Sequence, residues 1–474
     1  MVKKENATNG IVIPAEGTEE FAKLNKMAKK AIPLVLIIFI FGILEQQAFG
    51  MIFVNIGKEL GQPALSSLIT SLPGIVLGVI SVIYGSLGDF VSLKRMTLIG
   101  IGIFAIGSII GFMFSGNIWA VIIARILQSA GGQVPGSVFL VLVSKYIESK
   151  NRVVYYSIFT AVFRLSAAVG VLAAGYIMKL DWRWLFLIPL ISLLFIPSLS
   201  KTLPDMKASG TRVDVSGLVI AALFVGSLTM YFTNMNWIWL ICAAVFLISF
   251  VLYINKAKDP FITPKFFMNP AFVMTMVVIF VGYFFSYTLN AGVNAIGLNV
   301  FHIDSAEVSN LLVWSVLLAC VLGFVSGAII KKIGKTASII GALTFMGLGL
   351  IAIAVLIPYG KVMTLAIAPC IYYFGTAFFY SPIVDTAAKT VPAEESGRVL
   401  GFNDLIQAMT GSIGVSIFGN MMANNAFSGG SIVNTTKGAT STYANIFLIG
   451  GLIVLAAMVI FVVFKKTIYS KERR

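Results

Sequence analysis

Long apolar runs alternate with short polar connections along most of the chain. About 20 consecutive apolar residues in a helix cross the hydrocarbon core of a bilayer, so each run predicts one transmembrane helix. We count fourteen such runs. The expected spans are residues 32–54, 69–89, 97–115, 118–146, 153–179, 183–201, 215–233, 236–254, 271–296, 310–331, 337–357, 362–387, 399–424 and 442–464.

The composition supports a membrane protein and argues against a nucleic-acid partner. Of the 474 residues, 58% are hydrophobic and 11% are charged, whereas about 25% are charged in an ordinary soluble domain. The net charge is +15, but the basic residues are spread over short connections and both ends of the chain. A nucleic-acid-binding protein gathers them on one face. We therefore expect the lipid bilayer, and no nucleic acid, as a partner.

The distribution of basic residues predicts the orientation of the chain, because lysine and arginine accumulate in the cytosolic connections of membrane proteins. Placing the N-terminus in the cytosol puts most of the 34 Lys and Arg residues on that side, including the C-terminal stretch 465–474. We therefore expect both termini in the cytosol and an even number of spans.

A weak internal repeat predicts two helical bundles. The segment Gly323-Phe-Val-Ser-Gly-Ala-Ile-Ile-Lys-Lys332 follows the tenth expected span just as Gly85-Ser-Leu-Gly-Asp-Phe-Val-Ser-Leu-Lys94 follows the second. Such repeats are characteristic of secondary transporters. We expect a cytosolic tail at 1–31, a six-helix bundle at 32–202, a linker with two extra helices at 203–258, a second six-helix bundle at 259–464 and a cytosolic tail at 465–474.

The connection after the second span contains a short motif with a carboxylate, two glycines and a basic pair. Gly85, Gly88, Asp89, Lys94 and Arg95 resemble the signature loop between the second and third helices of the major facilitator superfamily. The resemblance implies the fold of that superfamily, all-α with two six-helix bundles, here with two inserted central helices. It also implies that these five residues gate the cytosolic end.

The count of fourteen spans with a central pair resembles the drug:proton antiporter branch of the superfamily, and most of all the tetracycline and multidrug efflux proteins of Gram-positive bacteria. The similarity extends through Arg125-Ile-Leu-Gln-Ser-Ala-Gly131 and Ser396-Gly-Arg-Val-Leu-Gly-Phe-Asn-Asp-Leu405. It implies a plasma-membrane exporter of amphiphilic drugs, tetracycline-like or multidrug, driven by proton antiport. We expect the protein to be a monomer.

The fifth-helix motif of that branch is only partly present. Gly170 and Gly175 fit it, but Val171 and Ala174 replace a proline and a glycine. A transporter of a lipid or endogenous metabolite, without proton antiport, therefore stays open as an alternative.

Two opposite charges are expected at the same depth in the membrane. Glu45 lies thirteen residues into the first span and Arg125 seven residues into the fourth, which runs in the opposite direction. At a rise of about 1.5 Å per residue, both reach a similar level in a core about 30 Å thick. A carboxylate that gains and loses an arginine neighbour couples conformation to proton uptake. A purely structural pair is the alternative.

Asp404, in the thirteenth span, is the second candidate for proton coupling, with a gating hydrogen bond as its alternative. Arg125 matches the arginine of the family's fourth-helix motif, which is associated with proton transfer. Arg164, near the middle of the fifth span, is expected to bind an anionic substrate group or to neutralise Glu45, with an internal structural partner as the alternative. The four deepest charges sum to zero, so they predict no sign for the substrate.

Polar and aromatic side chains on otherwise apolar helices mark the expected substrate cavity. The alternative for the aromatic residues is packing between helices or against lipid. The candidates are Gln46, Gln47, Gln128, Gln133, Arg164, Asn290, Asn294, Tyr373, Phe374, Phe378, Asn403 and Gln407.

Enzymatic chemistry is not indicated. The single histidine, His302, falls in an expected outer loop, the three cysteines lie inside apolar spans, and the sequence contains no nucleotide-binding glycine–lysine motif. We therefore expect a transporter with no cofactor and no metal.

Overall fold

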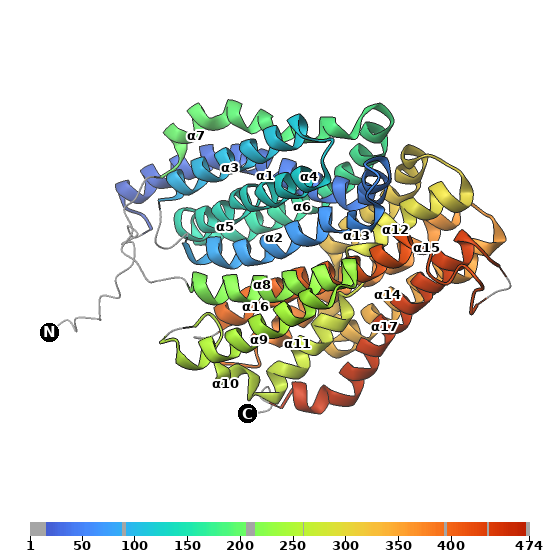
Figure 1. Ribbon diagram of the computed structural model, residues 1–474. Coiled ribbons are helices and arrows are strands. Elements are labelled where there is room, and N and C mark those ends of the chain that lie inside the picture. The colour runs from blue at the N-terminus through green and yellow to red at the C-terminus, as the bar shows by residue number, and fades with distance from the viewer. Residues whose placement is uncertain are drawn as a thin grey trace.

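The computed structural model describes residues 16–87, 92–204, 214–258, 260–392, 396–433 and 436–470, and its regular elements there are all helical (Figure 1). The N-terminal half contains α1 (Glu19–Glu59), η1 (Pro63–Leu65), α2 (Leu68–Leu87), α3 (Leu93–Met113), α4 (Ile118–Gly132), α5 (Val134–Tyr146), α6 (Ser149–Leu180), η2 (Trp182–Phe195) and α7 (Ile196–Thr202). The remainder contains α8 (Val215–Asn234), α9 (Trp237–Lys256), α10 (Pro264–Phe267), α11 (Pro270–Gly282), α12 (Thr288–Ile296), η3 (Gly297–Phe301), α13 (Ser305–Ile333), α14 (Lys335–Leu356), η4 (Ile357–Tyr359), α15 (Thr364–Ala388), α16 (Ser396–Ala423) and α17 (Ala439–Ile468).

Twelve helical stretches among the described residues are long and apolar enough to cross a bilayer. The expected all-helical membrane fold is therefore confirmed. Two other expected spans correspond to the short helices α11 and α12 and to the more polar α16. The count of fourteen stays a prediction.

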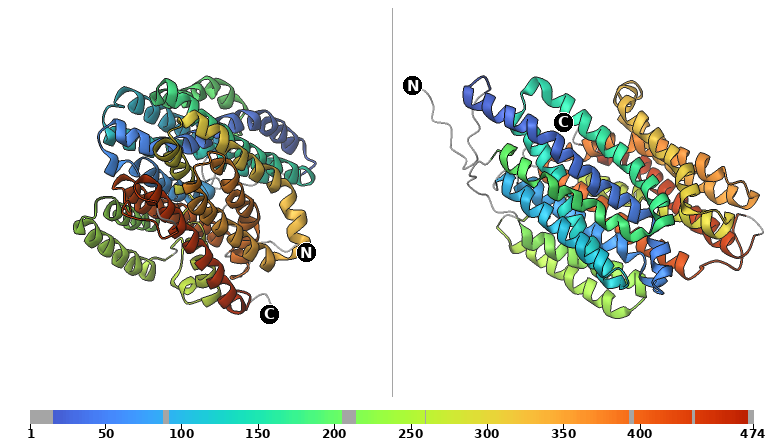
Figure 2. Two further views of the ribbon diagram at one scale, coloured as in Figure 1. Left: turned by 90° about the vertical axis from the view of Figure 1, so that its right-hand side faces the viewer. Right: turned by 90° about the horizontal axis from the view of Figure 1, so that it is seen from above.

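The helices form two groups that face each other. Helices α1 to α7 make the upper-left group in Figure 1, and α11 to α17 lie below it and to its right. Between the groups, α2 packs along α16 and α6 packs along α13. The pair α8–α9 lies at the periphery, where α8 contacts both α2 and α16 (Figure 2). The exact residue boundaries of the expected bundles stay a prediction.

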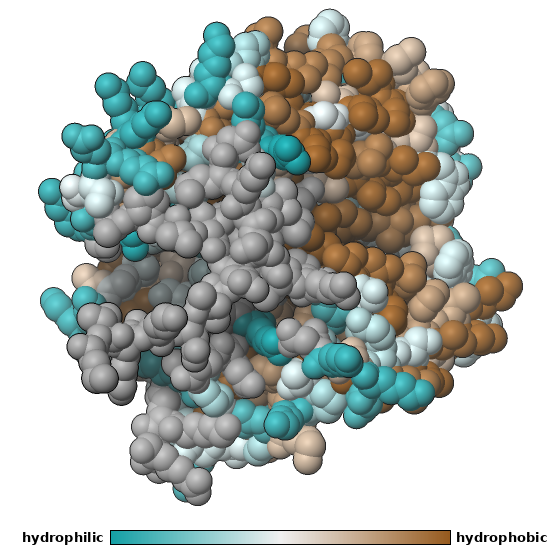
Figure 3. Space-filling model, turned by 90° about the vertical axis from the view of Figure 1, so that its left-hand side faces the viewer, coloured by the Kyte–Doolittle hydropathy of each residue, from teal (hydrophilic) through white to brown (hydrophobic). Residues whose placement is uncertain are grey.

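The surface of α9 shows why a bilayer must surround this fold. Ile238, Ile241, Val245, Ile248 and Leu252 are each more than half exposed, and their spacing of three or four residues places them on one face of the helix. A stripe of this kind is stable only against an apolar solvent. In the view of the end from which the N-terminus leaves, hydrophilic side chains gather at the left and lower edges, and hydrophobic ones cover much of the right side (Figure 3).

We call the end that carries Lys94 and Lys332 the cytosolic end, as predicted from the basic residues, and the opposite end the outer end. Of the expected gating residues, Gly85, Lys94 and Arg95 lie at the cytosolic end. Gly88 and Asp89 fall outside the described residues, and Gly85 belongs to the last turn of α2. Lys94 and Arg95 begin α3 after the N-cap Ser92, whose side chain accepts a hydrogen bond from the Arg95 backbone N–H.

Two helices are interrupted near the middle of the molecule. Gln133 separates α4 from α5, where Pro135 occupies the second position of the new helix. Residues 283–287 separate α11 from α12. Breaks at membrane depth are tolerated where the freed backbone groups are buried in protein or line a cavity. Both breaks flank the interior described below.

Candidate functional site

Glu45, Arg125 and Gln128 form a buried polar cluster between α1 and α4. Arg125 Nη1 lies 3.1 Å from Glu45 Oε2 and donates to Gln128 Oε1 at 2.8 Å. Gln128 Nε2 in turn donates to Glu45 Oε1 at 2.8 Å and to Ser108 Oγ at 2.9 Å. The three side chains are 1–4% exposed. Each of the three side chains is therefore hydrogen-bonded to the other two. These hydrogen bonds offset the cost of burying the ion pair.

Two glycines let the helices of this cluster approach closely, and one aromatic ring contacts its arginine. A Cβ on Gly42 of α1 would lie 2.8 Å from the backbone oxygen of Gly132, so only glycine lets α1 and α4 approach this closely. The Arg125 guanidinium carbon lies 4.3 Å from the centroid of the Phe49 ring, within cation–π range. Arg125 Nε is buried without a hydrogen-bond partner among the described residues.

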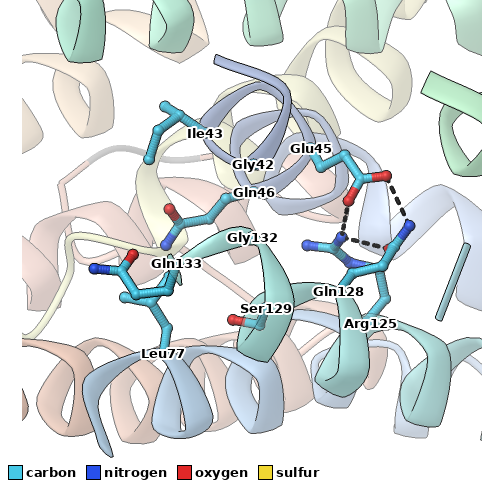
Figure 4. Close-up of a pocket in the computed structure, with 10 residues that line it drawn as sticks. All are labelled: Gly42, Ile43, Glu45, Gln46, Leu77, Arg125, Gln128, Ser129, Gly132 and Gln133. Carbon is cyan, nitrogen blue, oxygen red and sulfur yellow. Dashed lines mark hydrogen bonds and ion pairs between the residues drawn. The ribbon is translucent and has the colours of Figure 1, made fainter. Parts of the chain in front are cut away.

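Glu45 and its neighbours line a cavity of about 10 Å³, and Figure 4 shows the Glu45 carboxylate turned toward Arg125 and Gln128. The size of this cavity is close to the minimum that holds one water molecule. A single water there would contact polar groups from both α1 and the α4–α5 break. The lining residues are Gly42, Ile43, Glu45, Gln46, Leu77, Arg125, Gln128, Ser129, Gly132 and Gln133.

The expected substrate residues do not all share one surface. Gln46 and Gln133 line the small cavity, and Gln128 is held inside the buried cluster. Gln47 accepts from Asn290 Nδ2 at 3.4 Å, and Asn290 Oδ1 accepts from the Tyr373 hydroxyl at 2.8 Å. These contacts join α1, α12 and α15 at mid-depth.

A second polar region lies between the two helix groups, toward the cytosolic end. Asp404 accepts hydrogen bonds from Asn403 Nδ2, at 2.9 Å, and from the Tyr380 hydroxyl. The Asp404 side chain is exposed and Tyr380 is 44% exposed, although both belong to helix interiors. Both side chains are therefore accessible from outside the packed protein.

Arg164 of α6 faces the same region from the opposite helix group. It interacts electrostatically with Tyr283, Tyr373 and Tyr380. No carboxylate among the described residues forms an ion pair with it. The role expected of Arg164 in anion binding stays a prediction, but the structure sets it among tyrosines.

The remaining candidates are deeper in the C-terminal half. Phe374 packs edge-on against Phe345, with ring centroids 4.8 Å apart, and against Phe378 at 5.1 Å. Phe378 is 6% exposed and Asn403 is fully buried, so both belong to the packed interior in this conformation. Gln407 is partly buried, with a buried Nε2 that has no partner among the described residues.

Hydrogen bonds also close the outer end, and we call them the outer ladder. Asn294 Nδ2 donates to Asn55 Oδ1 at 3.1 Å and to the Met51 backbone oxygen at 3.3 Å. Asn55 donates to Ser305 Oγ at 3.4 Å, and Lys58 donates to Asn299 Oδ1 at 3.0 Å. The Asn294 side chain is fully buried. It therefore joins the two helix groups and does not line an open cavity in this conformation.

An ion pair and a tyrosine extend the outer ladder to α6 and α13. Lys179 Nζ lies 2.8 Å from Asp304 Oδ2, and the hydroxyl of Tyr176 lies 3.1 Å from Asn310 Oδ1. Most residues of the ladder were not among the sequence candidates. One of them had a signal in the sequence: Asn55 lies eight residues after the candidate Gln47, so both fall near one face of the same helix.

Two helix groups that face each other across polar residues are the arrangement of a helical membrane transporter. The chain matches the model of the Major Facilitator Superfamily over residues 35–211 and 214–415. The chain belongs to this superfamily, and the expected family is confirmed.

Its curated relatives come from Gram-positive bacteria. Multidrug transporter protein MdtP of Bacillus subtilis is 21% identical over 428 residues, covering 86% of this chain and 78% of the relative. Multidrug resistance protein 3 of the same species is 26% identical, covering 72% and 69%. Quinolone resistance protein NorB of Staphylococcus aureus is 23% identical, covering 84% and 88%.

Solved structures confirm the fold. The chain resembles the POT family transporter PepTSo with a TM-score of 0.68 and 14% identity, covering 93% of this chain and 98% of that one. It resembles the nucleoside transporter NupG with a TM-score of 0.62 and 15% identity, covering 92% and 99%.

Proposed function

We propose that this protein exports amphiphilic drugs by alternating access, in exchange for protons that bind at Glu45. The observation that carries the proposal is the buried Glu45–Arg125–Gln128 cluster beside a water-sized cavity. Placing a carboxylate within the membrane costs free energy, so carboxylates found there usually have a function and a partner. The names of the relatives, two multidrug proteins and one quinolone resistance protein, support drugs as the substrate class.

The coupling step follows from the geometry of the cluster. Protonation of Glu45 removes its charge, and Arg125 then loses its counterion while Gln128 loses a charged acceptor. The conformation that holds the closed cluster is therefore favoured by ionised Glu45, and a conformation that separates α1 from α4 is favoured by protonated Glu45. A difference in proton affinity between two conformations is the linkage that antiport requires. Asp404 is the second candidate for the same role.

Access is proposed to alternate between the two ends. The outer ladder closes one end here, while Asp404 and Tyr380 remain reachable by solvent. With both termini in the cytosol, this conformation takes up drug from the cytosolic side. Rupture of the outer ladder would release it on the other side.

The test is gradient-driven transport in proteoliposomes, comparing wild type with Glu45→Gln and using a tetracycline and ethidium as substrates. Glu59→Gln is the matched control, because Glu59 lies on the same helix but bonds to Trp182 and Arg183 near the surface. We expect Glu45→Gln to retain drug binding and to lose gradient-driven movement, while the control retains both.

Other outcomes have definite meanings. Unchanged coupling in Glu45→Gln contradicts its role and directs the search to Asp404. Absence of gradient dependence in wild type for both compounds contradicts drug antiport. It would favour a lipid or metabolite transporter, the alternative suggested by Val171 and Ala174 in the fifth-helix motif.

A further inference from the structure

A second cavity, of about 280 Å³, lies at the outer end, away from the cavity beside Glu45. Helices α1 and α6 supply one wall, and α12 with η3 supplies the other. The first wall belongs to the N-terminal helix group and the second to the C-terminal group. This cavity, which we call the outer cavity, therefore spans the seam between the two groups.

Much of the wall of the outer cavity is apolar. Val54 and Met178 come from the N-terminal group, and Ala295 and Leu298 come from the C-terminal group. The volume of about 280 Å³ equals that of roughly nine water molecules, at about 30 Å³ each. It is just below the range of drug pockets, about 300–1,000 Å³. The outer cavity therefore suits one short hydrocarbon chain, which gains free energy by leaving water.

Lys58 gives the outer cavity a positive charge. Its Nζ donates to Asn299 Oδ1 at 3.0 Å, and this acceptor is neutral. Asn299 is held in place by its own amide group, which donates to the Tyr443 hydroxyl at 2.8 Å and to the Ala295 backbone oxygen at 2.7 Å. An ammonium group has three N–H donors, so Lys58 keeps donors for a ligand.

The carboxylate in the same wall does not neutralise Lys58. Glu59 accepts hydrogen bonds from Trp182 Nε1 at 2.9 Å and from Arg183 Nη2 at 3.3 Å. Among the described residues, no carboxylate forms an ion pair with Lys58, in contrast to Arg183 with Glu59. The outer cavity therefore offers one cation beside an apolar surface, which is the complement of an amphiphile with one negative charge.

The outer cavity exists only while the outer end is closed. Asn55 lines it and bonds across the seam to Asn294 and Ser305, and Lys58 bonds across the seam to Asn299. Separation of the helix groups at this end would break these contacts and pull the two walls apart. A ligand that needs both walls binds the closed conformation and stabilises it by its difference in affinity for the two states.

We propose that the outer cavity is a regulatory site for a single-chain anionic amphiphile, which holds the outer end closed and slows transport. The hydrocarbon chain lies against Val54, Met178 and Leu298, and the anionic head pairs with Lys58. The binding is independent of the proposed function. Only the effect on transport rests on it, because it requires alternating access.

The first test is equilibrium binding to the full-length protein in phosphatidylcholine nanodiscs, with empty nanodiscs as the background. Three probes share a ten-carbon chain: decyl sulfate is anionic, decan-1-ol is neutral and decyltrimethylammonium is cationic. Decyl sulfate stays ionised and carries no protons across a membrane. We expect one saturable site for decyl sulfate, with about tenfold higher affinity than for decan-1-ol, because hydrogen bonds to charged groups are worth about that factor.

Two variants separate the charge from the apolar wall. Lys58→Gln should weaken decyl sulfate about tenfold and leave decan-1-ol unchanged, while its amide can still donate to Asn299. Lys58→Arg should retain the preference for the anion. Met178→Trp fills part of the cavity and should weaken both probes. Lys361→Gln is the control, because it removes an exposed cation from a loop at the same end.

The second test measures the conformation with spin labels on Gly116→Cys and Lys361→Cys, which lie in outer loops of the two helix groups. Decyl sulfate should lower the long-distance fraction in wild type. The same concentration should have no effect on Lys58→Gln. In proteoliposomes, decyl sulfate should slow gradient-driven ethidium transport by wild type and spare that of Lys58→Gln.

Equal affinities for the three probes overturn the proposal, as does unchanged binding of decyl sulfate to Lys58→Gln. A higher long-distance fraction with decyl sulfate also overturns it. Loss of decyl sulfate binding in phosphatidylglycerol nanodiscs would place a lipid headgroup at Lys58 and overturn the single-chain class. Failure of the proposed function looks different: wild type would show no gradient-driven transport but would keep the binding and the distance change.

Discussion

Arg125 Nη1 lies 3.1 Å from Glu45 Oε2, and neither side chain is more than 4% exposed. The two residues come from helices that run in opposite directions, and Gln128 bonds to both of them. A buried pair of this kind costs more when one partner is removed than when both are replaced. Its contribution can therefore be measured by comparing single and double substitutions.

Arg125→Met alone should strongly destabilise the protein, by about 3–5 kcal/mol, because it leaves the Glu45 carboxylate buried without a counterion. The double variant Glu45→Gln with Arg125→Met should recover most of that loss. Thermal unfolding of the purified protein in detergent measures both. If the double variant unfolds as early as the single one, the pair is not coupled.

Gly42→Ala should destabilise the crossing of α1 and α4. The added methyl group would lie 2.8 Å from the backbone oxygen of Gly132, which cannot rotate away. We expect a loss of about 1–3 kcal/mol, as for other overpacked sites. The measurement is thermal unfolding, with transport in proteoliposomes as a second readout.

Gly50→Ala is the matched control on the same helix, because nothing lies within 4 Å of a Cβ at that position. Alanine favours the helix by about 0.5–1 kcal/mol over glycine. The control should therefore be neutral or stabilising. Equal destabilisation by both substitutions would contradict a specific close contact at Gly42.

Substitutions in the outer ladder should open the outer end to different degrees. Asn294→Ala removes one buried and one partly buried hydrogen bond, worth about 1–3 kcal/mol together with the partners left unpaired. Asp304→Asn breaks the ion pair with Lys179, whose side chains are 48% and 46% exposed, and it should cost at most about 1 kcal/mol. Asn294→Ala should thus shift the population of the open state more.

The measurement is the distance distribution between spin labels on Gly116→Cys and Lys361→Cys, in a background where Cys242, Cys320 and Cys370 are serine. Both label positions lie in loops at the outer end, one in each helix group. A larger long-distance fraction in Asp304→Asn than in Asn294→Ala would contradict the ranking.

The ion pair at the outer end should respond to acid and not to mild changes of pH. The hydrogen bond from Lys179, with help from the backbone N–H of Glu307, holds the pKa of the Asp304 carboxyl below its usual value. A depressed pKa means that the stabilisation is fully present above the usual pKa, about 3.9, and is lost as pH falls through the depressed one. Between pH 8 and pH 5 the carboxylate is ionised in both the closed and the open states.

The difference in label distance between wild type and Asp304→Asn should therefore stay constant from pH 8 to pH 5. It should shrink below about pH 4, where wild type also loses the charge. A difference that disappears between pH 7 and pH 5 would show that another group controls this end.

The sequence by itself determined the helical membrane fold and the depth of its charges. Crossing a bilayer is a local property, because about 20 apolar residues must satisfy their backbone hydrogen bonds within one helix. Depth follows from counting residues along each helix. The counting placed Glu45 and Arg125 at one level, and in the structure they are in contact.

Only the tertiary structure decided which polar residues share a site. Gln128, Asn294 and Arg164 were expected to line one cavity, but they lie in a buried cluster, in the outer ladder and among tyrosines. The reason is that the rotation of each helix about its axis depends on close packing with its neighbours, as at Gly42 and Gly132. Contacts such as Asn294 with Met51 join residues 243 positions apart, and hydropathy carries no information about such partners.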